Sequence, residues 1–441
     1  MTIRKLLTTL TAAAMLGACS SDEAIVDERH TSVDAEEPIE EIVEPVRLGY
    51  GNSQLASISR AAIDPKNAAL DFDLDNIGVF MLAAYYQGST TTASANVVNW
   101  DRATAQNLQC SPIDNCKAEA KEGDSDLQTT LGGYFTQLFL KNKAGSSDSI
   151  YYYPVTSKYA NRFYGYYPYQ EEANIERTSS TRKVNFTGLD GKTEILWGRS
   201  DVGDSTTTRP INDDDKKGKF WKYSARFFRI NADSAKAFPT IAFKHKLMAF
   251  QFALQGQPDP LYPLDPYKKA NMVTVDTIIV NDVPTEATLT VADHENPEND
   301  GSIEFSWDDN TTFTNLGIIG DTLSSARGED DGVLAKQQVH DDDVKKIGQR
   351  LLLPVPATTG YQFSVYVKLK YEPTPGDIIY FESETPLSIE QVGGTSGKFD
   401  EGKVYTILLQ IAGPQEVNIK ATLDEWEDAE GDDAITPLEF F

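Results

Sequence analysis

Histidine and cysteine are scarce in this chain, whose 441 residues include four histidines and three cysteines. Metal centres and nucleophilic catalysis draw heavily on these two residue types. The sequence also lacks a G-x-S-x-G elbow, an H-E-x-x-H pair, a P-loop and a Cys-x-x-Cys pair. His245 lies in a strand-like run and is interpreted as a half-buried structural histidine. We therefore predict a protein that is not an enzyme, with no catalytic residue, no cofactor and no metal. Its many carboxylates leave a secreted glycoside hydrolase open as an outside alternative.

Basic residues are in deficit, with 40 lysines and arginines against 67 aspartates and glutamates and a net charge of −27. A nucleic-acid-binding protein needs a basic surface to meet phosphates, so we predict no nucleic-acid partner. The acidic clusters at residues 212–215, 293–301, 329–332 and 341–343 offer oxygens to calcium. None has the spacing of an EF-hand loop, so we interpret them as solvated loop charge and leave calcium binding open.

Sustained helical periodicity is also missing. A short helix is expected over residues 341–347, but most apolar runs are short and alternate with polar residues at a period of two, as in residues 363–369 and 403–409. Such alternation is typical of half-buried antiparallel strands. A chain of this length exceeds one ordinary core, so we predict an all-β fold with two β-sandwich domains in series.

No hydrophobic run is long enough to span a bilayer, because the apolar stretch at residues 6–16 is too short. It follows Arg4 and Lys5 and ends in Leu16-Gly17-Ala18-Cys19, the layout of a bacterial lipoprotein signal. We therefore predict a signal peptide over 1–19, lipidation of Cys19 with fatty acids such as palmitate, and attachment to the membrane through this lipid. A chance match in a cytosolic protein is the alternative.

Residues 20–45 are acidic, contain proline and show no apolar pattern, which predicts a flexible tether. The other two cysteines, Cys110 and Cys116, lie six residues apart. In an exported chain this spacing predicts a local disulfide that closes a small loop. A metal site is the poorer alternative, because no nearby histidine or further cysteine completes it.

Several motifs, taken in order, resemble the Bacteroidetes fimbrillins, the subunits of type V pili. The resemblance covers nearly the whole chain beyond residue 45. The motifs are Ser59-Arg60-Ala61, Asn76-Ile77-Gly78-Val79-Phe80, Phe163-Tyr164-Gly165-Tyr166-Tyr167-Pro168, Glu194-Ile195-Leu196-Trp197-Gly198, Phe243-x-His245-x-Leu247, Leu352-Leu353-Pro354 and the closing Gly402 to Trp426 region.

This resemblance implies two tandem transthyretin-like antiparallel β-sandwiches, which we place at 46–235 and 236–441. It also implies export as a lipoprotein and removal of the first strand, at 46–58, by an arginine-specific outer-membrane protease. Arg60-Ala61 best matches the position of that cut, with Arg47 as the runner-up. A donor strand from another pilin subunit then fills the groove. The expected location is the cell outer membrane, surface-exposed, and then the fimbrium.

The apolar content of the first strand supports this scheme. Burial of Val46, Leu48, Tyr50, Leu55 and Ile58 contributes about 1.5–3 kcal/mol for each side chain. Their loss removes on the order of 6–15 kcal/mol, comparable with the whole stability of a typical domain. An emptied groove must therefore be refilled by another strand.

The C-terminus departs from the stalk subunits of the family, which carry a C-terminal donor strand. Only a short, mostly acidic segment follows Trp426, and its apolar end contains Pro437. We therefore favour a tip, anchor or accessory subunit with an adhesive role and a host or glycan ligand, although residues 419–441 remain open as a donor. The alternative function is a surface glycan-binding lipoprotein of a polysaccharide-utilisation system.

Overall fold

The structure is a computed structural model, and its described residues all belong to one compact unit, Val43–Phe441. They are residues 45–51, 76–86, 100, 110–122, 136–142, 147–153, 159–200, 239–305, 312–319, 337–338, 344–354, 363–387, 399–413 and 416–425. The predicted signal peptide, most of the tether, Cys19, Arg60 and Ala61 lie outside these residues, so those predictions stay predictions.

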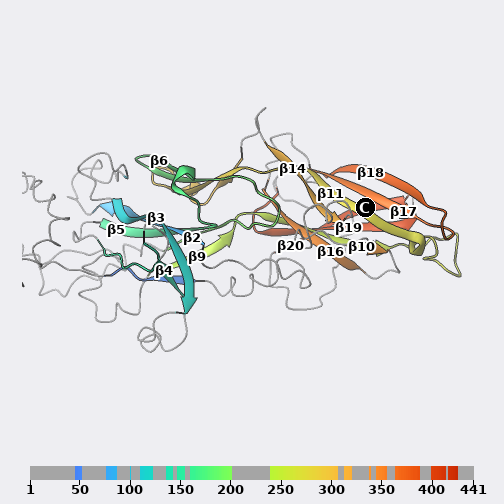
Figure 1. The fold of residues 1–441 in the computed structure, drawn as a ribbon, viewed down its shortest axis with the longest axis horizontal. Helices are drawn as coiled ribbons and strands as arrows, with labels where there is room; N and C mark the ends of the chain where they lie inside the picture. Colours follow the sequence, from blue (N-terminus) through green and yellow to red (C-terminus); the bar gives the residue numbers. More distant parts are fainter. Residues whose placement is uncertain are drawn as a thin grey trace, which may run out of the picture. The chain divides into compact units, whose positions relative to one another are not determined.

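The first sheet closes on itself, because its last strand along the chain returns to pair with its first. Its strands are coloured blue to yellow-green in Figure 1. Around the closed sheet the strands are β1 (Leu48–Gly51), β4 (Thr136–Leu140), β3 (Cys110–Glu122), β2 (Ile77–Tyr86), β5 (Tyr159–Tyr167), β8 (Leu196–Arg199) and β9 (Thr240–His245).

A smaller sheet packs against the closed one. In order it contains β13 (Ile303–Glu304), β12 (Ala287–Asp293), β7 (Thr181–Phe186) and β6 (Ile175–Arg177). Along β7 half-buried and buried residues alternate, as expected for a strand with one face on a core. Val184 and Phe186 from β7 share a buried cluster with Phe80 and Trp197 from the closed sheet.

Two further sheets form a β-sandwich. One contains β16 (Lys345–Leu352), β10 (Met248–Gly256), β19 (Lys403–Gly413) and β20 (Glu416–Glu425). The other contains β14 (Phe313–Ile319), β11 (Val273–Pro284), β17 (Phe363–Tyr371) and β18 (Ile379–Leu387), with β15 (Gln337–Gln338) paired to β11. Phe250, Phe363 and Tyr405 meet in the core between these sheets, and each is fully buried.

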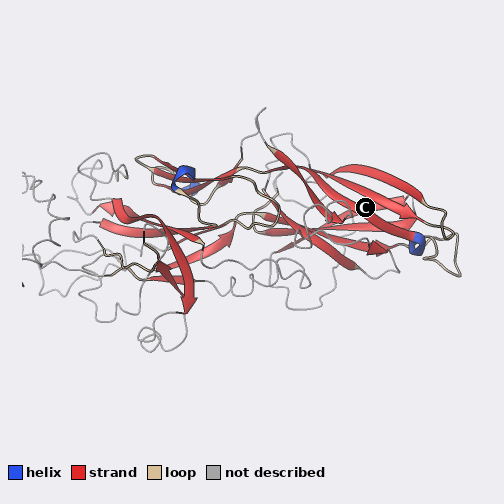
Figure 2. Cartoon of the chain, viewed as in Figure 1, coloured by secondary structure: helices blue, strands red, loops and turns tan. Residues whose placement is uncertain are grey.

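The predicted all-β class is confirmed (Figure 2). The helical segments of the described residues are the short 3-10 turns η3 (Glu172–Asn174), η6 (Ala270–Met272) and η7 (Pro297–Asn299). The helix expected over residues 341–347 is wrong, because β16 begins at Lys345. Within β16 the buried Ile347 and Leu351 contribute to different cores, so this strand has apolar residues on both faces.

Strands from both sides of the predicted domain boundary at residues 235/236 pair with each other. β9 pairs with β8 and β1, and β12 pairs with β7. Only Lys246 and Leu247 separate β9 from β10, and both are buried. His245, the residue before them, is buried, and its Nδ1 lies 3.1 Å from Glu194 Oε2. This environment agrees with the interpretation of His245 as a structural residue. The boundary stays a prediction about units that fold independently.

Candidate functional site

The first strand of the closed sheet is the candidate functional site, because it has a hydrogen-bonded neighbour on each side. β1 pairs antiparallel with β4, with Leu48 opposite Leu138, and parallel with β9, with Gly49 opposite Thr240. Loss of β1 would therefore break the closed sheet and leave β4 and β9 as two unpaired edges. Unpaired edges attract other strands.

Specific backbone contacts fix the position of this strand. The Gly49 N–H donates to Pro239 O at 2.8 Å, and the Val46 N–H donates to Tyr151 O at 2.7 Å. Pro45 forms an isolated antiparallel bridge with Tyr152. The chain thus passes residues 151–152 before it enters the groove, which is the space between β4 and β9 that β1 fills.

Val46 and Leu48 are the apolar side chains of the first strand whose burial the structure describes. Leu48 is fully buried and Val46 is half-buried, which agrees with their predicted role. β1 ends at Gly51, and Leu55 and Ile58 lie outside the described residues. The predicted strand at 46–58 therefore has a paired part that begins two residues later than expected.

Arg47, the runner-up processing site, is exposed directly before β1. A cut after Arg47 would leave Leu48 and the rest of β1 in the mature chain. A cut after Arg60 would separate β1 from everything that follows residue 60. Only the second position can empty the groove.

A network of four charges lies beside the entry to the groove. Asp148 contacts Lys141 at 2.8 Å and Lys121 at 3.1 Å, and Glu119 contacts the same lysines at 2.5 and 3.2 Å. Hydrogen bonds from Lys141 and Lys121 lower the pKa of Asp148 below its ordinary value, and the same two lysines lower the pKa of Glu119. Local sequence patterns could not predict this network, because its members come from β3, from the residue after β4 and from the segment before residue 150.

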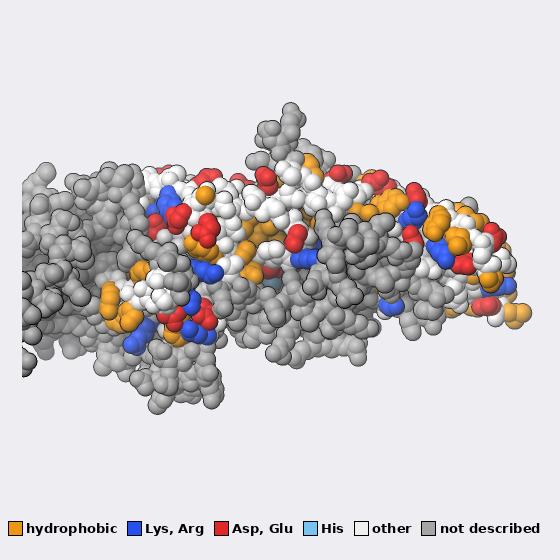
Figure 3. All heavy atoms as spheres, viewed as in Figure 1, with side chains coloured by type: hydrophobic (Ala, Val, Ile, Leu, Met, Phe, Trp, Pro, Cys, Tyr) orange, Lys and Arg blue, Asp and Glu red, His pale blue; other side chains and the backbone are white. Residues whose placement is uncertain are grey.

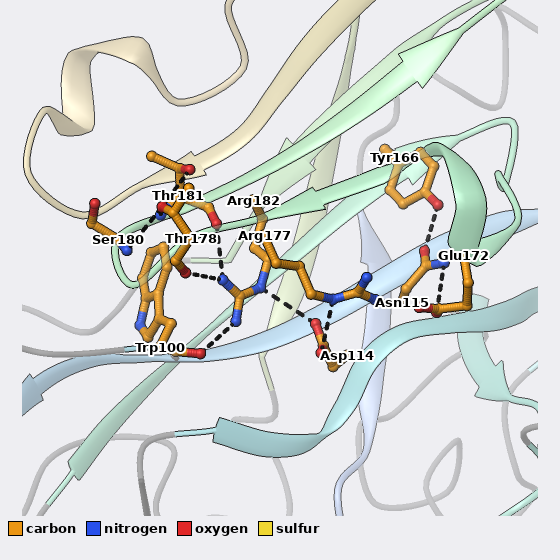
Figure 4. A network of polar contacts seen from close by, with 10 residues as sticks. All are labelled: Trp100, Asp114, Asn115, Tyr166, Glu172, Arg177, Thr178, Ser180, Thr181 and Arg182. Atoms are coloured by element: carbon orange, nitrogen blue, oxygen red, sulfur yellow. Dashed lines mark hydrogen bonds and ion pairs between the residues drawn. The ribbon is translucent and has the colours of Figure 1, made fainter. Parts of the chain in front are cut away.

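A second polar network connects β3 to β6 and β7, with the buried side chains of Arg182 and Asp114 at its centre (Figure 4). The Arg182 side chain is 1% exposed and lies against Asp114, with Nε 3.4 Å from Oδ1. Its two terminal nitrogens donate to the carbonyl oxygens of Thr178, Thr181 and Trp100, each at 2.8 Å. Arg177 joins Asp114 to Glu172, at 3.2 and 2.7 Å.

These contacts use four of the five N–H donors of the Arg182 guanidinium, so we interpret the network as structural. Nearby, the Tyr166 hydroxyl donates to Asn115 Oδ1 at 2.5 Å, and Asn115 Nδ2 donates to Glu172 at 3.2 Å. Asn115 has a φ of 60°, an uncommon backbone conformation that this residue type tolerates. Sequence reasoning missed this network because Trp100, Asp114 and Arg182 are far apart along the chain.

The predicted disulfide between Cys110 and Cys116 is wrong. Cys116 is buried and forms no disulfide, and both residues belong to β3 instead of a small loop. Their partners on β2 are Leu82 and Val79, three positions apart, which corresponds to roughly 10 Å along a strand. A disulfide needs a Cα separation of about 4.4–6.8 Å. The prediction failed because the residues between the two cysteines continue as a strand instead of forming a loop.

The acidic cluster at residues 293–301 is held by its own hydrogen bonds. Asp293 accepts from the backbone N–H groups of Glu295 and Asn296 at 3.1 and 3.0 Å. Asp300 accepts from Arg199 at 2.7 Å, and its side chain is 2% exposed. Burial raises the pKa of Asp300, although the Asp293 N–H and Arg199 oppose the shift. The interpretation as solvated charge is wrong for these two carboxylates, which shape the loop.

The described ranges of the chain contain no cluster of three or more histidine, cysteine, aspartate or glutamate side chains able to hold a metal ion. They also contain no helix with the length and apolar character needed to cross a membrane.

The described fold defines an all-β protein in which a short first strand completes a closed sheet beside a β-sandwich. No family model matches the chain, and no curated protein matches its sequence. Among solved structures it is similar to a candidate cell adhesion protein from Bacteroides uniformis, at 14% identity and a TM-score of 0.40, over 87% of this chain and 99% of that one.

Two other neighbours have related descriptions. A candidate cell adhesion protein from Parabacteroides distasonis is 9% identical, with a TM-score of 0.38, over 89% of this chain and all of that one. The fimbrial anchor protein Mfa2 from Porphyromonas gingivalis is 8% identical, with a TM-score of 0.32, over 88% of this chain and 99% of that one. These neighbours are adhesion and fimbrial proteins of Bacteroidetes, the group that the sequence motifs resemble.

Proposed function

We propose that this protein is a structural and adhesive subunit of a type V pilus that assembles by donor-strand exchange. The observation that carries the proposal is the pairing of β1 with β4 on one side and β9 on the other. A proteolytic cut that frees β1 would leave a groove with two open edges and an empty Leu48 site. A strand from another subunit supplies both the ladder hydrogen bonds and the missing side chain.

Energetics favour refilling of this groove. Leu48 alone contributes about 1.5–3 kcal/mol by burial, and each ladder hydrogen bond adds about 0.5–1.5 kcal/mol. A domain has only about 5–15 kcal/mol of stability, so the opened sheet is strongly weakened. The same strand blocks assembly as long as it stays in place.

The geometry favours Arg60-Ala61 as the processed bond in this proposal. The cut must fall after Gly51 to release β1, and Arg60 is the only arginine between β1 and β2. The subunit is proposed to reach the surface of the outer membrane as a lipoprotein attached through Cys19, and to enter the fimbrium after the cut.

The described C-terminal strand supports a tip or accessory position. Glu416–Glu425 forms β20, which pairs antiparallel with β19 along its length. Residues 419–425 of the alternative donor segment 419–441 are therefore used within their own sheet.

Controlled proteolysis tests the proposal. The full chain is treated with an arginine-specific protease, and oligomers are followed by size-exclusion chromatography with N-terminal sequencing. We expect a new N-terminus at Ala61 and conversion of monomer into higher species, with a purified partner pilin added if needed. Arg60→Ala should remain monomeric, whereas Arg47→Ala, the matched control, should assemble normally. A chain that is cleaved cleanly at Arg60 and never accepts a strand would contradict donor-strand exchange.

A further inference from the structure

We propose that the four-charge network of Glu119, Lys121, Lys141 and Asp148 controls how fast β1 leaves the groove after the chain is cut. This inference rests on the proposed function and assigns a regulatory element to the same site. The element is residues 148–152, here called the clamp segment.

The clamp segment is attached to the start of β1 on one side. Its Tyr151 carbonyl accepts the Val46 N–H at 2.7 Å, and Tyr152 forms a bridge with Pro45. Any movement of β1 out of the groove must therefore break contacts with this segment as well as the ladders to β4 and β9.

On its other side the clamp segment is attached to the closed sheet. The Ser149 N–H donates to Leu140 O at 2.8 Å, and the Tyr151 hydroxyl donates to Lys141 O at 2.9 Å. Asp148 adds two ion pairs, with Lys141 and Lys121, which connect the segment to the end of β4 and to β3. The charges thus hold in place the segment that contacts the entering chain.

The four side chains of the network differ in their exposure to solvent. The Lys141 side chain is 16% exposed and Glu119 is 23% exposed, whereas Lys121 and Asp148 are 40% and 49% exposed. Exposed ion pairs weaken as salt screens them, and the Debye length falls to about 3 Å at 1 M salt. The clamp should therefore loosen at high ionic strength.

The network should be insensitive to pH near neutrality. Asp148 faces Lys121 from β3 and Lys141 from the end of β4, Glu119 lies across the same lysines, and Tyr151 contacts the backbone of Lys141. The pKa values of both carboxyl groups are lowered from 3.8 and 4.5, so their stabilisation is complete above those values. It is lost only as the pH falls through the lowered values.

A strand-replacement experiment measures the clamp directly. The full chain is cut at Arg60-Ala61, and a fluorescent peptide with the sequence of residues 45–51 is added in excess. The anisotropy of the peptide reports how fast it replaces β1. We expect Asp148→Asn to accelerate replacement about threefold to tenfold at low salt, because both ion pairs of the clamp segment are lost. Lys121→Met should give a smaller acceleration, since Lys141 still holds Asp148.

Two comparisons complete the design. Glu372→Gln removes an ion pair of similar length, 2.7 Å to Lys370, outside the clamp, and should exchange like the unmodified chain. About 1 M salt should bring the unmodified chain close to the rate of Asp148→Asn. The melting temperature of each uncut variant shows whether the closed sheet itself has been weakened.

The outcomes separate the clamp from the proposed function. If the unmodified chain and Asp148→Asn take up the peptide at equal rates, the groove exchanges strands but the clamp is wrong. An equal acceleration by Glu372→Gln also overturns it. If no variant ever takes up the peptide after a complete cut, donor-strand exchange itself fails, and the clamp fails with it.

Discussion

Leu48 is the residue through which β1 contributes most clearly to the core of the closed sheet. It is fully buried opposite the buried Leu138. We expect Leu48→Ala to lower the free energy of unfolding of the uncut chain by about 2–5 kcal/mol, because it removes apolar contacts and leaves a cavity. Urea denaturation measures the change. The matched control is Val344→Ala, where the side chain is 36% exposed and the expected loss is small.

Arg182 supports a different region, the packing of β7 beneath β3. Removing one partner of a buried ion pair is strongly destabilising, because the other partner stays buried without its full compensation. We expect Arg182→Ala to cost about 3–5 kcal/mol, and Lys370→Ala, a change in a half-buried pair at the surface, to cost less than about 1 kcal/mol. Thermal and urea denaturation of both variants provide the comparison. Equal stability of the two variants would show that the contacts of Arg182 do not hold β7 in place.

Predictions for single residues were correct where a residue type usually occupies one kind of environment in a folded protein. Leu48 in a strand-like run was expected to be buried, and it is. It failed for Cys116 and for Asp300, since a cysteine pair or an acidic cluster has several outcomes that depend on distant strands. The structural role of Arg182 could not be predicted from the sequence, because its carbonyl acceptors come from Trp100 and from the turn before β7.

At the scale of elements, β1 predicts which strands the groove will accept. The Gly49 N–H donates to Pro239, and a proline at that position has no N–H to donate. We expect a peptide of residues 45–51 to bind the cut chain after β1 has been removed, and its Gly49→Pro form to bind at least about tenfold more weakly. Fluorescence anisotropy measures both affinities.

The control peptide carries the same substitution one position before the strand. Arg47→Pro changes an exposed residue outside β1, so this peptide should bind nearly as well as the original. If both proline peptides bind alike, the occupant of the groove does not adopt the register of β1. That result would indicate that the peptide pairs mainly with β4 instead of β9.

Individual strands were largely predictable, whereas their partners were not. The run Phe363–Tyr371 alternates buried and half-buried residues as its sequence indicates. The parallel pairing of β1 with β9 joins segments about 190 positions apart, and nothing in either segment specifies the other. The alternation of residues within each strand likewise could not predict that β7 pairs with β12, because β12 lies beyond the expected domain boundary.

At the scale of the whole molecule, the surface combines strong negative charge with a localised apolar area. Figure 3 shows acidic and basic side chains interspersed over the described part of one face, and hydrophobic side chains gathered near the end of the β17–β18 hairpin. Leu261 and Leu264, in the loop between β10 and η6, are 79% and 101% exposed. Ile378 and Ile379, at the start of β18, are 44% and 43% exposed.

These exposed leucines lie in a loop with a defined conformation. Asp259 accepts from the Leu261 N–H at 2.9 Å and pairs with Lys269 at 2.7 Å, while its own N–H donates to Pro266 at 2.7 Å. The Glu372 N–H donates to Met272 O at 3.0 Å, which brings the loop's end beside the turn that leads to β18. The loop thus keeps two leucines exposed to water in a defined conformation, which makes it a candidate contact surface.

Replacing both leucines tests whether this surface drives association between molecules. Because the side chains are exposed, Leu261→Ser with Leu264→Ser should leave the melting temperature of the full chain nearly unchanged. The net charge of −27 opposes contact between copies, so association that does occur should depend on such apolar areas and should increase with salt. Sedimentation velocity over a concentration series should therefore show weaker association for the double variant than for the unmodified chain. Val344→Ser, at an exposed apolar residue elsewhere, is the control, and equal association of all three proteins would exclude the loop as a contact surface.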